Sequence, residues 1–374
     1  MTDKSPSQKI PFLDLKTQYK TLQKEIDTGI KRVIQNCSFI LGEECQAFEK
    51  EFSKHSGIDF IIGCGNGTDA LSLALETLGI GPGDEIITTP FTWISTVETI
   101  AHRGAIPVFC DISLEDFTLD PEKISEKITP KTKAIVAVHL YGQPARMPEI
   151  CSLAKEKNLK VIEDAAQAHD AKIAGQPIGT FGDAVTFSFY PGKNLGAYGD
   201  AGAIGTIHKD IDEKIRLLRN HGQKKKNDFL MLGYNSRLDG IQAAILRAKL
   251  PHLTQWTKDR QKCADFYRKF LGKTSQIILP NHFPKAQSVY HQFVIRTQKR
   301  DQLQLVLEEN DIPTAIHYPN ALHLTPAFKF LGHKKGDFPN AELASQEVLS
   351  LPCYPELSTD KIQYISEVIH TFFQ

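Results

Sequence analysis

The sequence predicts an α/β fold, in which a large domain with a mostly parallel sheet is followed by a smaller α+β domain. Strand-like apolar runs alternate with helix-like stretches from about residue 58 to 207, as in strand–helix–strand units. Beyond Pro251 the pattern changes to a long helix followed by separated strands and helices. The 374 residues suffice for two domains and a large core. We therefore expect an N-terminal segment and large domain over residues 1–250 and a small C-terminal domain over residues 251–374.

The strands of the large domain are predicted from short apolar runs. These runs lie at residues 58–62, 85–89, 106–110, 134–139, 161–163 and 184–189. Helical stretches separate several of them, at residues 69–78, 93–103 and 147–158. Buried strands joined by helices run mostly parallel, because a helical crossover returns the chain to the same edge of the sheet.

Helices and strands of the second domain follow a helix at residues 238–250, whose apolar residues recur at helical spacing. Pro251 marks the expected end of that helix. The next elements are expected in the order helix, strand, helix, strand, at residues 253–270, 292–297, 300–310 and 314–317. Near the N-terminus, residues 19–36 form an expected helix that can pack with either domain.

Charge and composition exclude several classes of protein. Lys plus Arg and Asp plus Glu both number 44, so a net charge of zero favours neither nucleic acid nor an anionic membrane as a partner. No apolar run reaches the roughly 18 residues of a membrane helix. Residues 1–9 are polar and lack the apolar core of a signal peptide, which predicts a cytoplasmic protein. The seven cysteines form no C-x-x-C pair, so we expect reduced thiols and no metal site.

A glycine-rich turn, Gly63-Cys64-Gly65-Asn66-Gly67-Thr68-Asp69, follows an expected strand and opens an expected helix. Glycines let the backbone approach an anion, and a helix N-terminus offers free N–H groups and the positive end of its dipole. Thr68 adds a hydroxyl. One interpretation is a phosphate site, and the other is a tight turn ahead of a helix cap. The dinucleotide fingerprint G-x-G-x-x-G is not matched, because glycine falls at Gly67 rather than at position 68. This spacing disfavours a nicotinamide oxidoreductase.

Lys193 lies in a glycine-rich loop directly after the strand expected at 184–189. Rigid backbone and partial exclusion of water favour the neutral, nucleophilic form of a lysine so placed. Asp164 ends another apolar strand. Lysine for an aldehyde and aspartate for a ring nitrogen are the two groups that a pyridoxal phosphate (PLP) enzyme needs. Glu163 competes with Asp164, although strand alternation places the two on opposite faces.

Four further features would fit such a site, and each has a structural alternative. Trp93 follows a strand end and can stack on a flat ring, or it is a core aromatic. Gln167 can donate a hydrogen bond to a ring hydroxyl. Ser188 can reach the same phosphate as the glycine-rich turn, or it satisfies a partner on a buried face. The run Lys224-Lys225-Lys226 can steer a nucleotide diphosphate, or it is solvated surface.

In their joint order these phrases resemble the DegT-type sugar-nucleotide aminotransferases, which are PLP-dependent enzymes of fold type I. The resemblance runs through nearly the whole chain, from Pro11 to Pro352. It is most specific at residues 65–71, 163–167, 188–202 and 235–239. The resemblance implies a homodimer with active sites at the subunit interface.

The resemblance also implies roles for individual residues. Lys193 matches the lysine that forms the Schiff base with the cofactor, and Asp164 matches the partner of its pyridine nitrogen. Gln167 matches the partner of the ring hydroxyl, and Trp93 the stacking aromatic. Phosphate contacts are matched by Gly67, Thr68 and Ser188, and by Asn235 reaching over from the neighbouring subunit. The segment with His317 and Tyr318 resembles one that faces keto-sugar substrates.

The implied activity is transfer of an amino group from glutamate to a dTDP- or UDP-linked keto sugar, through pyridoxamine phosphate as intermediate. Three phrases, at residues 138–143, 195–200 and 335–339, look closest to enzymes that aminate the 3-position. The product would be an amino sugar for surface polysaccharide, such as lipopolysaccharide, or for another glycan.

A sugar dehydratase and a 4-keto-sugar aminotransferase are the alternatives on the same scaffold. One dehydratase branch replaces the lysine with histidine, whereas this chain has Lys193. A sugar-sensing regulator is disfavoured by the zero net charge.

Overall fold

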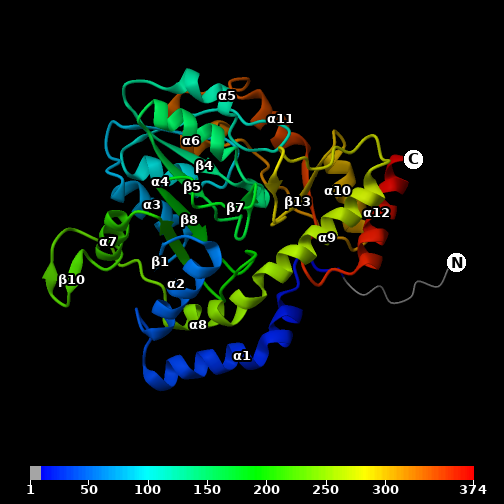
Figure 1. The fold of residues 1–374 in the computed structure, drawn as a ribbon. Coiled ribbons are helices and arrows are strands. Elements are labelled where there is room, and N and C mark those ends of the chain that lie inside the picture. The colour runs from blue at the N-terminus through cyan, green and yellow to red at the C-terminus, as the bar shows by residue number, and fades with distance from the viewer. Residues whose placement is uncertain (1–9) are drawn as a thin grey trace.

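The computed structural model describes residues 10–374 and is built around a seven-stranded sheet (Figure 1). The polar stretch on which the predicted localisation rests, residues 1–9, lies outside the described residues. Across the sheet the strands are β1 (Phe60–Cys64), β9 (Gly202–Thr206), β8 (Ala184–Ser188), β5 (Lys160–Asp164), β4 (Thr132–Val138), β2 (Glu85–Thr88) and β3 (Ile106–Phe109). Strand β9 runs antiparallel to both of its neighbours, and the remaining pairs are parallel. The predicted α/β class with a mostly parallel sheet is confirmed.

Strand β9 is missing from the predicted strands, and its glycines explain why. Its sequence, Gly202-Ala203-Ile204-Gly205-Thr206, has low β-propensity. Both glycines stand where the sheet leaves no room for a side chain. A Cβ atom at Gly202 would lie 2.3 Å from the carbonyl oxygen of Asn66, and one at Gly205 would lie 2.7 Å from Val185 Cγ1. Strand β9 is therefore specified by close packing, which a reading of local propensity does not detect.

We expect the substitution Gly202→Ala to lower the free energy of unfolding by about 3 kcal/mol, the upper part of the range for overpacking. The obstructing atoms at Gly202 belong to the backbone of Asn66 and Gly67, which cannot rotate away. Gly81→Ala is the matched control, because a Cβ there would meet nothing within 4 Å. Urea unfolding followed by circular dichroism measures both variants. Equal midpoints for the two would contradict the close packing.

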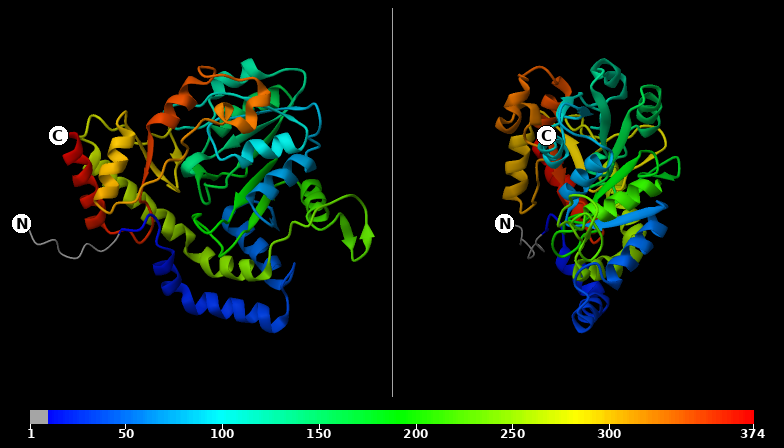
Figure 2. Two further views of the ribbon diagram at one scale, coloured as in Figure 1. Left: turned by 180° about the vertical axis from the view of Figure 1, so that it is seen from behind. Right: turned by 90° about the vertical axis from the view of Figure 1, so that its left-hand side faces the viewer.

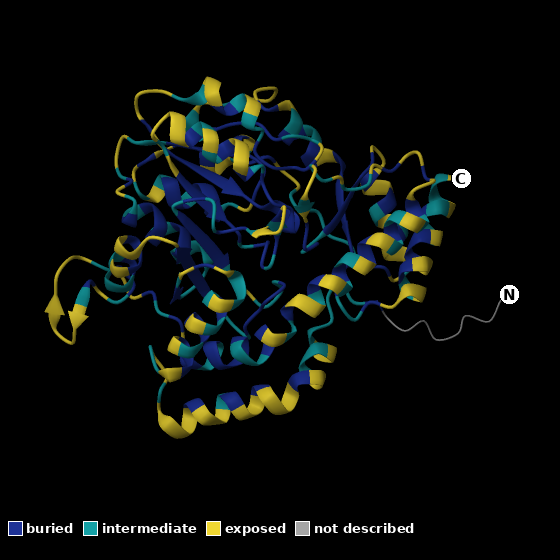
Figure 3. Cartoon of the chain, viewed as in Figure 1, coloured by how far each residue is buried: buried dark blue, intermediate teal, exposed yellow. Residues whose placement is uncertain are grey.

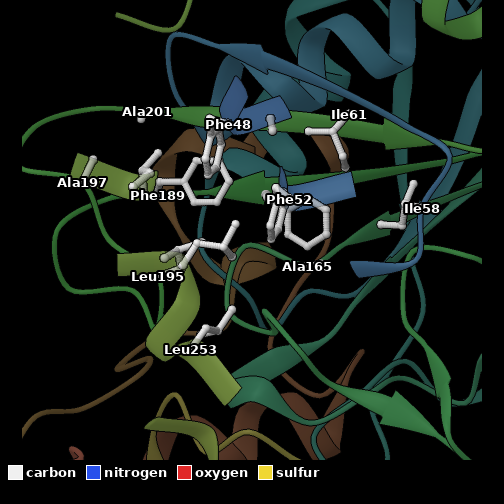
Figure 4. Packing of buried hydrophobic residues seen from close by; sticks show 14 of the residues in the cluster. Phe48, Phe52, Ile58, Ile61, Ala165, Phe189, Leu195, Ala197, Ala201 and Leu253 are labelled. Atoms are coloured by element: carbon white, nitrogen blue, oxygen red, sulfur yellow. The ribbon is translucent and has the colours of Figure 1, made fainter. Parts of the chain in front are cut away.

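Helices cover both faces of the sheet and give a three-layer architecture. One face is covered by α3 (Gly67–Thr77), α4 (Ser95–His102) and α7 (Lys209–Leu218). The other is covered by α2 (Glu43–Ser56), α6 (Met147–Glu156) and α8 (Gly240–Lys249). Helices α2 and α7 were not predicted, since they carry many charges and few apolar positions. On α2, Phe48 and Phe52 stack on each other and meet Phe189 edge-on (Figure 4). This aromatic cluster lies at the carboxyl end of β8, because Phe189 directly follows the last residue of that strand.

The helix predicted at residues 19–36 is the N-terminal helix α1 (Leu15–Asn36), and it packs along α8 (Figure 1). Of the two predicted domains, it therefore packs with the region before residue 250. Leu22 and Ile26 are buried against Ile245 of α8. A Cβ on Gly29 would lie 3.3 Å from Ala244 Cβ, so the two helices approach closely there. The opposite face of α1 is exposed (Figure 3).

After α8 the chain passes through one 3-10 turn, Leu250–His252, into α9 (Leu253–Leu271). The C-terminal region continues with β13 (Phe293–Arg296), α10 (Arg300–Glu309), α11 (Pro339–Glu347), β14 (Val348–Leu351) and α12 (Thr359–Phe373). The prediction of a strand at 314–317 is wrong. Only Ala315 forms a bridge, to Ser350, and β14 is the partner of β13. The division of the chain at residue 250 stays a prediction; residues 321–348 contribute to an apolar cluster with Phe91 and Phe109 of the large sheet region.

Several short elements complete the described chain. They are α5 (Pro121–Ile124), β6 (Lys172–Ile173), β7 (Gln176–Pro177), β10 (Gln223–Lys225), β11 (Asp228–Phe229), β12 (Ala286–Gln287) and the 3-10 turns Ser125–Lys127, Leu140–Gly142, Leu322–Leu324 and Pro326–Leu331. The hairpin of β10 and β11 projects away from the body of the molecule (Figures 1 and 2). Within residues 10–374, no helix is long and apolar enough to cross a membrane.

Candidate active site

A cavity of about 780 Å³ opens at the carboxyl ends of β5 and β8, the edge where α/β sheets bind ligands. It brings together nine of the ten residues to which the family resemblance gives a role, whereas the run Lys224-Lys225-Lys226 lies outside it, at the hairpin of β10 and β11. Those lining it are Gly67, Thr68, Trp93, Asp164, Gln167, Ser188, Lys193, His317 and Tyr318. Asn235 does not line this cavity. It is exposed, and its backbone forms a bridge with Asn220.

Lys193 is held by a loop that closes on itself after β8. The Lys193 N–H donates to the Tyr190 carbonyl at 2.9 Å, and Ala197 N–H donates to the Phe189 carbonyl at 2.8 Å. Burial lowers the pKa of Lys193 to about 8, and the neighbouring Asp164 carboxylate opposes part of that shift. Burial also lowers the pKa of His317, to about 4. Near neutral pH this imidazole is uncharged, and about a tenth of Lys193 is the free amine, far more than for an exposed lysine.

We expect Lys193 in the cofactor-free protein to react with an amine-selective acylating reagent with a half-maximal rate near pH 8. Exposed lysines titrate near pH 10.4. Because the Asp164 carboxylate favours the ammonium form, Asp164→Asn should move the Lys193 midpoint to lower pH. Competitive labelling with peptide mass spectrometry measures the midpoint. A Lys193 midpoint near 10 would show that the amine is solvated and not activated by burial.

Asp164 ends β5 with its carboxylate toward the cavity and is only 4% exposed. Burial raises its pKa, whereas a hydrogen bond from Thr96 Oγ1 to Oδ2 at 2.8 Å opposes the shift. Glu163 points to the other face, as strand alternation predicts. Its carboxylate accepts from the N–H groups of Gly179 and Gly182 at 2.7 and 2.8 Å. N–H groups of the loop after β7 therefore satisfy the Glu163 carboxylate, whereas the Asp164 carboxylate remains available to a ligand.

The glycine-rich turn forms one end of the cavity. Helix α3 begins at Gly67, and Asn66 caps it by accepting from Asp69 N–H at 2.8 Å. In the described chain the N–H groups of Gly67 and Thr68 donate to no other residue, as expected for a first helical turn. A Cβ at Gly67 would lie 2.7 Å from Ser188 Cβ, so the glycine keeps β8 and the turn in contact. Two free N–H groups beside the hydroxyls of Thr68 and Ser188 make this end suitable for an anion.

Aromatic residues also line the cavity. Trp93 is 58% exposed, and its ring lies 6.0 Å from that of Tyr318 at an angle of 43°. Gln167 accepts from Tyr141 N–H at 2.7 Å and donates through Nε2 to the Tyr318 hydroxyl at 2.9 Å. One N–H of the Gln167 amide is left for a ligand. His317 is tied to Ser350, with its Nδ1 2.8 Å from the hydroxyl oxygen.

Several lining residues were not found from the sequence, among them Ser95, Thr96, Arg260 and His291. Thr96 holds Asp164 from a position 68 residues away, and Ser95 lies 2.8 Å from the Thr68 hydroxyl. His291 Nδ1 contacts Asn194, next to Lys193. A single sequence carries no sign of such contacts, because each joins residues distant in the chain.

These groups fit pyridoxal phosphate. The cavity offers an amine of lowered pKa for the aldehyde, a buried carboxylate for the ring nitrogen, free N–H groups and hydroxyls for the phosphate, and an exposed indole for the ring face.

Comparison with known proteins agrees with this fit. The sequence profile of the DegT/DnrJ/EryC1/StrS aminotransferase family matches residues 20–370. A pleiotropic regulatory protein of Geobacillus stearothermophilus is 47% identical over 98% of this chain and 99% of its own. The UDP-N-acetyl-3-dehydro-α-D-glucosamine 3-aminotransferase of Acidithiobacillus ferrooxidans is 44% identical over 96% of this chain and 97% of its own. The crystal structure of S. venezuelae DesV in complex with a ketimine intermediate superposes with a TM-score of 0.96 at 41% identity, covering 98% of this chain and 99% of that one. The chain belongs to the DegT/DnrJ/EryC1/StrS aminotransferase family of PLP-dependent enzymes.

Proposed function

We propose that this protein transfers the amino group of glutamate to a nucleotide-linked 3-keto sugar, with dTDP or UDP as the nucleotide. The observation that carries the proposal is the meeting of Lys193 and Asp164 in one cavity beside the free N–H groups of α3. The 3-aminotransferase relative supports the 3-position and a nucleotide-linked substrate. The product would be an amino sugar for surface polysaccharide, such as lipopolysaccharide, or for another glycan.

Pyridoxal phosphate, when bound, supplies an aldehyde that takes up amines and a ring that accepts electrons from the carbon losing its proton. The Lys193 amine would bond to the aldehyde at rest, and once displaced would carry a proton from one carbon to the next as base and then acid. Asp164 would keep a proton on the ring nitrogen. Its burial among few competing donors makes that contact stronger than it would be in water.

The remaining residues would bind and orient. Gly67, Thr68 and Ser188 would hold the phosphate. Trp93 would cover one ring face, and the spare N–H of Gln167 would donate to the ring hydroxyl. We assign His317 and Tyr318 to the sugar, because they stand in the cavity wall beside Trp93.

A homodimer with shared active sites is part of the proposal. Asn235 is exposed and lies outside its own cavity, so a phosphate contact from it would have to reach the cavity of a second copy. The nearby hairpin and the segment after it expose large apolar side chains: Phe229, Leu230, Met231, Leu232 and Tyr234. A patch of this kind marks a protein interface. Mixing Lys193→Ala and Asn235→Ala chains should then restore activity in part, since one site of the mixed dimer receives both intact residues.

The substrate is tested by mass spectrometry of the products from 3-keto and 4-keto sugars linked to dTDP or UDP, each supplied with glutamate. An amino sugar from a 3-keto substrate supports the proposal, and one from a 4-keto substrate alone would reassign the position. Loss of water without formation of 2-oxoglutarate would identify a dehydratase. A pure protein that binds PLP but turns over none of the sugars would favour the regulatory role that the Geobacillus relative's name describes.

We also propose that the protein works in the cytoplasm, without nucleic-acid or membrane partners. The balance of 44 formal charges of each sign supports the absence of such partners, since it gives no overall attraction to a polyanion. Fractionation of cells that express the protein from its own gene tests the location.

A further inference from the structure

A buried lysine outside the cavity, Lys249, contacts the loop that carries Lys193. Lys249 is the last residue of α8, and none of its surface is exposed. Its Nζ donates to the Gly196 carbonyl at 2.7 Å and lies 4.0 Å from the centre of the Tyr198 ring. No carboxylate of residues 10–374 lies within salt-bridge distance of it.

This arrangement is unfavourable for stability alone. An ammonium group buried without a carboxylate loses its hydration, and one carbonyl with one aromatic face returns only part of that free energy. Burial accordingly lowers the pKa of Lys249 to about 7. An apolar side chain of similar length would fill the same space without the desolvation cost. The amino group is therefore explained by its hydrogen bond to the Gly196 carbonyl and not by stability alone.

Through this hydrogen bond Lys249 contacts the closed loop that carries Lys193. At Gly196 the loop turns back on itself so tightly that a Cβ would lie 2.4 Å from the Pro191 carbonyl oxygen. The next hydrogen bond, from Ala197 N–H to the Phe189 carbonyl, completes the closure at 2.8 Å. With the loop this compact, a shift of the Gly196 carbonyl moves Lys193, three residues earlier.

Helix α8 contacts the loop at a second point, from the same face of the helix. Gln242 lies seven residues, or two turns, before Lys249, and its Oε1 accepts from Tyr198 N–H at 2.9 Å. Leu195 and Ala197 of the loop and Leu246 of α8 belong to the same buried apolar cluster. We infer that Lys249, assisted by Gln242, is a positioning residue for Lys193, whose loop it holds in place through the Gly196 carbonyl.

The inference rests on the proposed role of Lys193 and is tested with Lys249→Met, which keeps the volume and removes the donor. Because a displacement of about 1 Å can cost a hundredfold in rate, we expect kcat to fall about 10- to 100-fold with little change in KM for either substrate. Proton transfer would then limit turnover, so the isotope effect on kcat with 2-deuterated glutamate should rise. In the cofactor-free protein, hydrogen exchange of the peptide spanning residues 190–198 should accelerate.

Arg247→Met is the matched control, because Arg247 lies on the same helix and pairs with Glu44 and Glu51 at 2.6 Å, away from the loop. It should lower stability and leave kcat and the isotope effect unchanged.

If Lys249→Met does not fold, Gln242→Leu probes the second contact and should change the same readouts in the same direction. A fall in active fraction with an unchanged isotope effect and unchanged exchange would reduce Lys249 to a structural residue. Absence of transamination in the parent protein would instead overturn the proposed function, while the exchange experiment would still report on the loop.

Discussion

Lys193→Ala should lower kcat for transamination by about 10⁴-fold or more, while the protein stays folded. On the role proposed for Lys193, the substitution removes both the amine that would bond to the cofactor and the base that would move the proton, and proton transfer by a positioned group alone accounts for 10²- to 10⁴-fold. Little stability should be lost, since the loop is closed by backbone hydrogen bonds and by the packing of Leu195 and Ala197. Steady-state release of 2-oxoglutarate measures the loss.

Borohydride provides an independent measurement of the same role. In the parent protein it should bleach the cofactor absorbance and attach the cofactor to the peptide that contains Lys193. The control variant Lys273→Ala, at an exposed lysine, should retain both the rate and the labelling. A Lys193→Ala protein that works at the parent rate, or a label on another lysine, would contradict the assignment.

Asp164→Asn should lower kcat by about 10²- to 10³-fold, the loss usual for a fixed electrostatic contact in a site shielded from water. An amide has nearly the shape of the carboxylate, its oxygen can keep the bond from Ala166 N–H, and its NH2 can donate to the Thr96 hydroxyl, which lies 2.8 Å from Oδ2, so the fold should be kept. It cannot hold a proton on the ring nitrogen, and the ring then accepts electrons poorly. The cofactor should remain bound through Lys193 and the phosphate contacts.

Thr96→Val separates the charge of Asp164 from its orientation. It removes the hydrogen bond that opposes the raised pKa of Asp164 and leaves the carboxylate in place. We expect a loss near tenfold, as for one hydrogen bond to a charged group. A loss for Thr96→Val as large as that for Asp164→Asn would mean that the hydrogen bond from Thr96 matters as much as the charge that it orients.

The sequence predicts the centre of the site because local rules place those residues. Lys193 follows a strand and a Pro-Gly turn, and Asp164 ends a strand whose alternation turns Glu163 away; both features follow from the order of the chain. A helix is likewise expected after the glycine-rich turn, at residues 69–78, and α3 begins two residues earlier, at Gly67. The family resemblance then supplied the role of each residue.

Other parts of the molecule depend on contacts that local rules do not contain. Strand β9 was missed because Gly202 is selected by the close approach of Asn66 and not by strand propensity. The predicted strand at 314–317 has the right composition, but it pairs with β14 only through Ala315, so no strand forms there. Thr96 and Lys249 read as ordinary helical residues until the fold brings them to Asp164 and Gly196.

The most direct test of the account is the fate of the amino group. With ¹⁵N-labelled glutamate and a nucleotide-linked 3-keto sugar, the account predicts one ¹⁵N atom in each amino sugar and one 2-oxoglutarate for each sugar aminated. An unlabelled product, a product that has lost water, or a lack of turnover in the PLP-loaded protein would contradict it.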